Sequence, residues 1–96
     1  MAQDRIRTAE VEQLLEALVA LDSTDALYAF LKDLCTVREI QELSQRLQVA
    51  RMLDAGESYL TIQEKTGASA TTISRVSKAL NYGADGYLHV IELLSK

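Results

Sequence analysis

The chain has 96 residues, of which 48% are hydrophobic and 25% are charged, and it contains no proline, one cysteine and one histidine. This composition is typical of a single small globular domain, and it excludes a long disordered tail, a disulfide framework and a multi-domain machine. The formal net charge is −4, so no overall basic excess indicates a nucleic-acid partner.

The charges are unevenly distributed along the chain. Residues 1–57 hold six basic and eleven acidic side chains, residues 58–83 hold three and one, and residues 84–96 hold one and two. Only the middle segment has a positive excess, which makes it the candidate for contact with an anionic partner.

Met1 is followed by Ala-Gln-Asp-Arg without an apolar stretch, and no apolar run approaches the roughly 18 residues that span a bilayer. We therefore expect a soluble cytoplasmic protein with no membrane partner.

Apolar residues recur every three or four positions along the chain, and this spacing predicts an all-α fold. The first three stripes are Val11, Leu14, Leu15 and Leu18; Leu27, Phe30, Leu31 and Leu34; and Ile40, Leu43, Leu47 and Ala50. Ser23 and Thr24 are candidate caps of the second helix, and the segment 36–39 has capping-box spacing at the start of the third. The long third helix is expected to run to about Ala55 and to end at Gly56.

Three further helices are expected after Gly56. Ser58 caps a short helix that ends at Thr66, and Ser69 caps another that ends between residues 81 and 83, with Gly67 between the two. Asp85 can cap a last helix, whose buried side includes Leu88, Ile91 and Leu94. The whole chain, residues 1–96, is thus predicted to form one domain of six helices.

Residues 58–82 have the layout of a helix-turn-helix. Gly67 allows the left-handed backbone that turns one helix across the other. Ile62 on the first helix can meet Ile73, Val76 and Leu80 of the second beneath that turn.

The opposite face of the second helix combines small polar residues with cations, which suits a major groove. Thr71 and Ala70 can approach base edges, while hydroxyl groups and lysines suit phosphates, which fix the register of the protein on the duplex. The predicted DNA-binding residues are Lys65, Ser69, Ala70, Thr71, Thr72, Ser74, Arg75, Ser77 and Lys78.

Six amphipathic helices in so short a chain offer more apolar surface than one thin bundle can hide. We therefore expect a homodimer, in which the first two helices and the last helix pack against their copies. A monomeric bundle is the alternative.

The remaining functional alternatives are weaker. One histidine and one cysteine cannot form a metal cluster, and no phosphate-binding loop or nucleophile elbow is present, so an enzyme is not expected. His89 is expected at the surface or at an interface, and Cys35 as a buried unreactive thiol rather than a sensor. The main rival to DNA binding is a protein-interaction module with a degenerate helix-turn-helix.

The chain resembles the Trp repressor superfamily, and most closely its Trp-repressor-related YerC/YecD branch. The resemblance spans nearly the whole chain, through Leu43–Ala50, Leu53–Gly56, Gly67–Arg75 and the closing helix from Ile91. It implies an intertwined all-helical dimer that presents two reading heads to successive major grooves. The implied function is a sequence-specific transcriptional regulator of double-stranded DNA, with repression favoured over activation.

In the tryptophan-binding members of that superfamily, two arginines that fall on Arg46 and Arg75 hold the corepressor. The glycine that makes room for the indole ring is Val76 here, and a serine that holds the amino group of the ligand is Ala79. A valine would overfill a site that fits a flat ring. We therefore expect no tryptophan corepressor and no other cofactor, while a smaller anionic ligand between the two arginines stays open.

Overall fold

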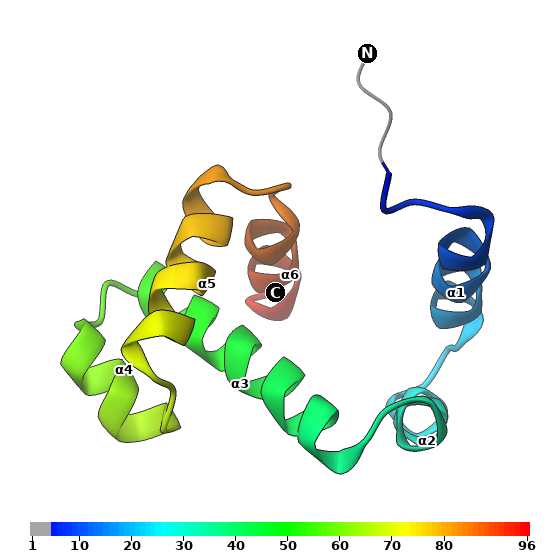
Figure 1. Cartoon of the computed structure of the whole chain (residues 1–96), viewed down its shortest axis with the longest axis horizontal. Coiled ribbons are helices and arrows are strands. Elements are labelled where there is room, and N and C mark those ends of the chain that lie inside the picture. The colour runs from blue at the N-terminus through cyan, green and yellow to red at the C-terminus, as the bar shows by residue number, and fades with distance from the viewer. Residues whose placement is uncertain (1–4) are drawn as a thin grey trace. The chain divides into compact units, whose positions relative to one another are not determined.

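The computed structural model describes residues 5–96, which form six α-helices and no strand (Figure 1). Their bounds are α1 Ala9–Ala20, α2 Thr24–Leu34, α3 Val37–Asp54, α4 Tyr59–Thr66, α5 Ala70–Tyr82 and α6 Gly86–Leu94. The predicted all-α fold of six helices is confirmed. Residues 1–4, on which part of the expectation about the N-terminus rests, lie outside the described residues.

The chain divides into two compact units, residues 1–37 and residues 38–96. In the first unit, Thr8 caps α1 and Ser23 caps α2, each accepting a hydrogen bond from a backbone N–H of the first turn. Arg7 Nε lies 2.6 Å from Glu12 Oε2, and this hydrogen bond lowers the pKa of the Glu12 carboxyl. No residue of α1 or α2 is buried, so the first unit has no apolar core of its own.

The second unit holds the core of the described chain. Ile62 of α4 and Ile73 of α5 are fully buried, as predicted, together with Val49 of α3. The buried cluster consists of Val49, Ala50, Met52, Ile62, Ala68, Ile73 and Val76, with Leu53, Tyr87 and Ile91 packed against it. The core therefore joins the C-terminal half of α3 to α4, α5 and one side of α6.

The apolar stripe predicted for α3 is only partly the buried one. Ala50 is buried, but Leu43 is 46% exposed, whereas Val49 and Met52, which are outside the predicted stripe, are in the core. This happens because α3 carries apolar residues on two faces, and only the face near its C-terminus meets α4 and α5. The other face is left without a partner within the unit.

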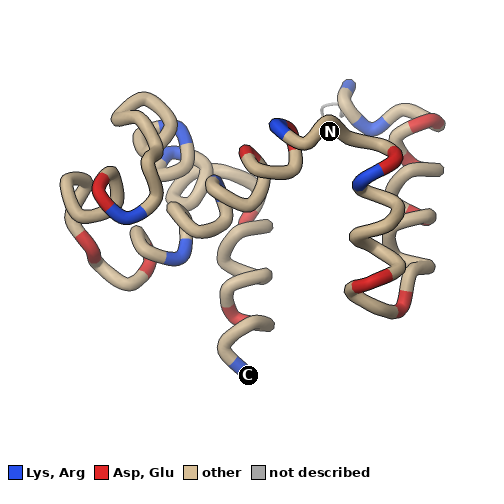
Figure 2. The backbone as a smooth tube through the Cα atoms, turned by 90° about the horizontal axis from the view of Figure 1, so that it is seen from below, with Lys and Arg blue, Asp and Glu red and all other residues tan. Residues whose placement is uncertain are grey.

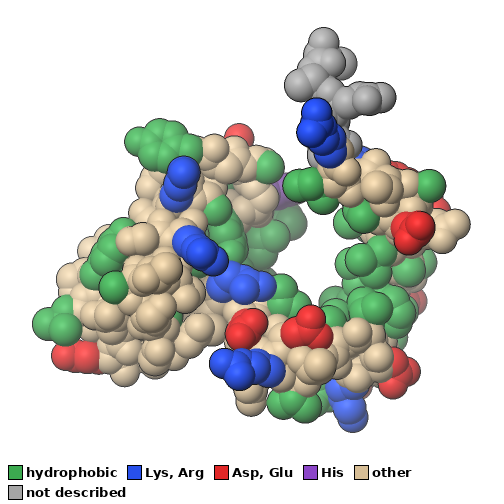
Figure 3. All heavy atoms as spheres, in the orientation of Figure 1, with side chains coloured by type: hydrophobic (Ala, Val, Ile, Leu, Met, Phe, Trp, Pro, Cys, Tyr) green, Lys and Arg blue, Asp and Glu red, His purple; other side chains and the backbone are tan. Residues whose placement is uncertain are grey.

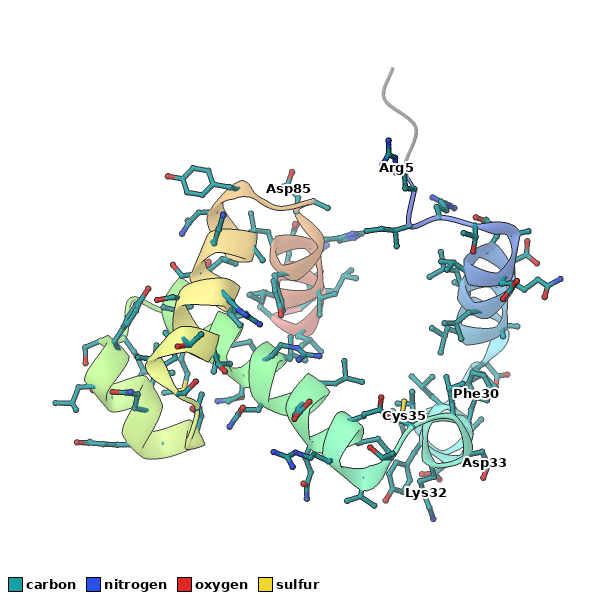
Figure 4. The ribbon with its side chains drawn as sticks, viewed as in Figure 1. Arg5, Phe30, Lys32, Asp33, Cys35 and Asp85 are labelled. Atoms are coloured by element: carbon teal, nitrogen blue, oxygen red, sulfur yellow. The ribbon has the colours of Figure 1, made fainter. Side chains whose placement is uncertain are left out.

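The predicted caps of α4 and α5 are confirmed, whereas the predicted cap of α6 is not. Gly67 has φ of 75° and ends α4 in the left-handed conformation. Asp85 stands at the N-cap position of α6, but its side chain makes no capping hydrogen bond. Its backbone is left-handed, with φ of 65°, and this turns the carboxylate away from the first amide groups of α6, which an extended capping residue would face (Figure 4).

Two further expectations are tested in the described part of the chain. Cys35 is half-buried at the C-cap of α2 rather than fully buried (Figure 4). None of the helices in residues 5–96 is both long enough and apolar enough to cross a membrane.

Candidate nucleic-acid interface

Helices α4 and α5 begin with the same capping arrangement. At α4, Ser58 Oγ accepts from the Thr61 amide at 3.2 Å and donates to Thr61 Oγ1 at 2.9 Å. At α5, Ser69 Oγ accepts from the Thr72 amide and donates to Thr72 Oγ1, both at 3.1 Å. Each serine satisfies an amide that the first turn of a helix leaves without a partner. The two caps fix where each helix of the pair begins.

The turn between the two helices is held by the hydroxyl group of Thr66. This hydroxyl donates to the Ile62 carbonyl at 2.7 Å and accepts from the Ala68 amide at 3.1 Å. Gln45 Nε2 of α3 donates to the Thr66 carbonyl at 3.1 Å. Together with buried Ala68, these bonds fasten the turn to the end of α4 and to α3.

Helix α5 has a buried face and an exposed face. Ile73, Val76 and Leu80 are buried, as predicted. Ala70, Thr71, Ser74, Arg75 and Lys78 are exposed, and so is Ser69 at the cap. The residues predicted to face DNA from α5 are thus brought together on one side of the helix, except Thr72 and Ser77.

Thr72 and Ser77 lie at the two edges of the exposed face and are half-buried. The Thr72 hydroxyl is part of the cap with Ser69. Asn81 Nδ2 donates to the Ser77 carbonyl at 2.9 Å and to Ser77 Oγ at 3.4 Å. Both hydroxyl groups therefore have partners within the protein, unlike those of Thr71 and Ser74.

Among the predicted DNA-binding residues, Lys65 lies on α4, where it forms an ion pair. Its Nζ is 3.4 Å from Glu57 Oε1, and the lysine side chain is 64% exposed. An exposed ion pair of this kind contributes about 0 to 1 kcal/mol, so a phosphate can replace the carboxylate at little cost.

Positive charge gathers on α5. The helix contains Arg75 and Lys78 and no acidic residue. In Figure 3, Lys and Arg side chains lie over α5 and the neighbouring part of α3 on the face toward the viewer. The helices of the first unit, by contrast, carry several acidic positions (Figure 2). The local field at α5 is thus positive although the net charge of the chain is −4.

The two residues that distinguish this chain from tryptophan binders differ in burial. Val76 is 2% exposed and belongs to the core cluster. Ala79 is exposed and lines an apolar groove of about 520 Å³ with Leu47, Ala84, Gly86, Tyr87 and Val90. Arg46 and Arg75 are both exposed. Within residues 5–96, no group of three or more His, Cys, Asp or Glu side chains is placed to hold a metal ion.

Sequence reasoning missed Gln45, Thr66 and the pairing of Glu57 with Lys65. The only sequence signal for Thr66 is a hydroxyl residue directly before the turn glycine. Gln45 and Glu57 give no signal, because their partners are 21 and 8 residues away along the chain.

Comparison with known proteins places the chain among similar sequences and structures. The family model described as Trp repressor protein matches residues 9–95. The uncharacterized protein YerC of Bacillus subtilis (strain 168) is 49% identical over 87 residues, which are 91% of this chain and 84% of that protein.

Two solved structures match over most of their length. A crystal structure of a TrpR-like protein from Eubacterium eligens has a TM-score of 0.91 and 52% identity, and the match covers 95% of this chain and 94% of the other. A crystal structure of a protein from Staphylococcus aureus has a TM-score of 0.91 and 44% identity, with 95% and 91% covered.

Proposed function

Since this chain belongs to the Trp repressor family, we propose that it is a sequence-specific regulator of transcription that binds double-stranded DNA as a homodimer and acts as a repressor in the cytoplasm. Family members are regulators and not enzymes, and the chain is therefore not an enzyme. The observation that carries the proposal is the exposed face of α5, which presents two cations and small polar groups and has no acidic residue.

The chemistry of this face fits a major groove. Ala70 and Thr71 begin α5, and their small side chains allow the backbone to approach base edges. The methyl groups of both residues can touch a thymine methyl, and the Thr71 hydroxyl can donate or accept. Arg75 and Lys78 follow one and two turns later, where they suit phosphates.

The homodimer is supported by the apolar surface that a single chain leaves exposed. No residue of α1, α2 or α6 is buried. Among their large hydrophobic side chains, Leu34 is 50% exposed, Leu93 is 55% exposed and Leu94 is 50% exposed. Full burial of such a side chain contributes about 1.5 to 3 kcal/mol, and roughly half of this is still to be gained at each of these positions, which favours pairing with a second copy. A two-fold dimer carries two α5 helices, which fits a palindromic operator.

We also propose that DNA binding is independent of tryptophan. The Val76 side chain is buried in the core cluster that also contains Val49 and Ala50 of α3. An indole ring between α3 and α5 at this level would have to displace it. Arg46 and Arg75 are then a surface residue and a phosphate contact, respectively, and the arrangement of α5 needs no ligand to complete it.

Selection of duplexes from a random-sequence pool tests this function. The purified protein is presented with the pool at two salt concentrations, first without amino acids and then with tryptophan. We expect an enriched palindrome with half-sites about one helical turn apart, the same with and without tryptophan. Its affinity should fall steeply with salt, because each neutralised phosphate contributes about −0.9 to the slope. No enrichment under any condition contradicts DNA binding and favours the protein-interaction module.

A further inference from the structure

Tyr82 ends the recognition helix and is almost completely exposed. Its side chain is 86% exposed, the highest value among the large hydrophobic residues in residues 5–96. A tyrosine combines an apolar ring with a hydroxyl donor and is enriched where both are used at an interface. At this exposure, it contributes little to the core.

Tyr82 continues the face of α5 that carries the cations. Thr71, Arg75, Lys78 and Tyr82 are separated by four, three and four residues, a spacing that places them in one row along a helix. The row contains no acidic side chain. A surface on which an exposed phenol follows two cations is complementary to an anionic partner, and the proposed function identifies that partner as DNA.

The length of α5 determines what Tyr82 reaches. At 1.5 Å per residue, Tyr82 lies about 16 Å along the helix axis from Thr71. The major groove is about 12 Å wide. If Thr71 lies at the base edges, as proposed above, and α5 runs across the groove, Tyr82 lies beyond the groove, level with the sugar–phosphate backbone.

We propose that Tyr82 is a backbone contact of the recognition helix. Its hydroxyl donates a hydrogen bond to a phosphate oxygen, and its ring packs against the adjoining deoxyribose. A tyrosine has no cationic group, so this contact adds affinity without neutralising a phosphate. It carries no sequence information, because every nucleotide offers the same partners. This inference rests on the proposed function.

The experiment compares full-length wild type, Tyr82→Phe, Tyr82→Ala and Lys78→Ala by fluorescence anisotropy over a salt series. Each protein is titrated with the selected duplex and with a scrambled duplex. We expect Tyr82→Phe to weaken binding to both duplexes by about tenfold, the loss of one hydrogen bond to a charged group, and Tyr82→Ala to weaken it further. The salt slope should stay at the wild-type value for both, whereas Lys78→Ala should reduce it by about one.

Tyr28→Phe is the matched control, because Tyr28 is a tyrosine that is 57% exposed on α2. It should bind like wild type. If wild type binds the selected duplex and Tyr82→Ala binds it equally well, the Tyr82 contact is refuted while the proposed function stands. If Tyr82→Ala sediments as a monomer at a concentration where wild type is a dimer, Tyr82 belongs to the subunit interface and the proposal is also refuted. If wild type binds no duplex, the proposed function itself fails.

Discussion

Thr71 and Thr72 are neighbours on α5 with the same side chain and different surroundings. Thr71 is exposed, whereas Thr72 is half-buried with its hydroxyl in the Ser69 cap. The sequence placed both in the DNA-binding set, because two adjacent threonines after a cap look alike. Thr71 and Thr72 differ in the direction of their side chains, and this direction decides which of the two is free to contact a base.

This difference predicts opposite effects of two substitutions. Thr71→Ala should relax base preference at one position of each half-site, by about 1 to 3 kcal/mol, and should leave the melting temperature unchanged. Thr72→Val removes only the hydroxyl group that accepts a hydrogen bond from the capping residue Ser69, so it should lower stability by roughly 1 kcal/mol and keep the base preference. Repeated duplex selection and thermal denaturation measure the two effects. An unchanged preference in Thr71→Ala would show that this residue reads no base.

Substitution of Val76 tests whether DNA binding is independent of tryptophan. Wild type should bind the selected duplex equally with and without tryptophan. The double variant Val76→Gly with Ala79→Ser opens space in the core and adds a polar group, so its binding should become weaker and should recover when tryptophan is added. Val76→Ala is the control, because it shortens the side chain without the added serine. Tryptophan-indifferent binding by the double variant would argue against the idea that Val76 takes the place of a ligand.

The buried residues were only partly predictable. The row Ile62, Ile73, Val76 and Leu80 follows from helical spacing and is buried. Val49 and Met52 are buried as well, but α3 has apolar residues on two faces, and spacing alone does not say which face meets α5.

At the scale of elements, the helix bounds were largely predictable because the chain marks them with serine caps and glycines. Ser58 and Ser69 cap α4 and α5 as expected. Asp85 is the exception, since its left-handed backbone depends on how α6 returns to the core. Hydrogen bonds between elements, such as Gln45 to Thr66, depend on packing and leave no local pattern.

Gly67 and Gly83 should respond differently to alanine, in an order that their φ angles alone do not suggest. Gly67 has φ of 75°, but a Cβ there would meet nothing within 4 Å. Gly67→Ala should therefore cost only the left-handed backbone, about 1 to 2 kcal/mol. Gly83 has an ordinary φ of −88°, yet a Cβ would lie 2.3 Å from the Ala79 carbonyl oxygen.

Gly83→Ala should thus be the more destabilising of the two substitutions, because a backbone atom must move at the end of α5. Urea denaturation of both variants measures the difference. Gly67→Asn is the control, since asparagine tolerates the left-handed region better than alanine, and it should be the mildest of the three. A larger loss for Gly67→Ala than for Gly83→Ala would contradict the geometry at the end of α5.

At the scale of the whole molecule, the sequence indicated more apolar surface than one chain can bury, and the exposed leucines of α2 and α6 agree with that surplus. It did not indicate that the chain divides after Val37. That division depends on the absence of buried contacts in α1 and α2, and a stripe of apolar residues on its own does not show whether its partner is in the same chain.

The proposed homodimer predicts a mass near twice the 10.6 kDa of one chain. Leu34→Glu changes a side chain that is already 50% exposed in the single chain, so it should leave the folding of the second unit intact and shift the protein toward the monomer. Ala29→Glu adds the same charge to the opposite side of α2 and should remain dimeric. Sedimentation equilibrium over a range of protein concentrations compares the two. A dimer in both variants would exclude the apolar face of α2 from the interface.

The lack of any buried side chain in α1 and α2 has a consequence for turnover. In the proposed dimer, these helices are protected only after a second chain has arrived, and until then their backbone is open to proteases. If the protein is the proposed dimer, we expect newly made chains that fail to meet a partner to be degraded first. Because pairing depends on the square of chain concentration, a modest rise in synthesis rate yields a disproportionate rise in DNA-competent protein. The proposed dimer therefore predicts a threshold in the response of DNA binding to the level of expression of the chain.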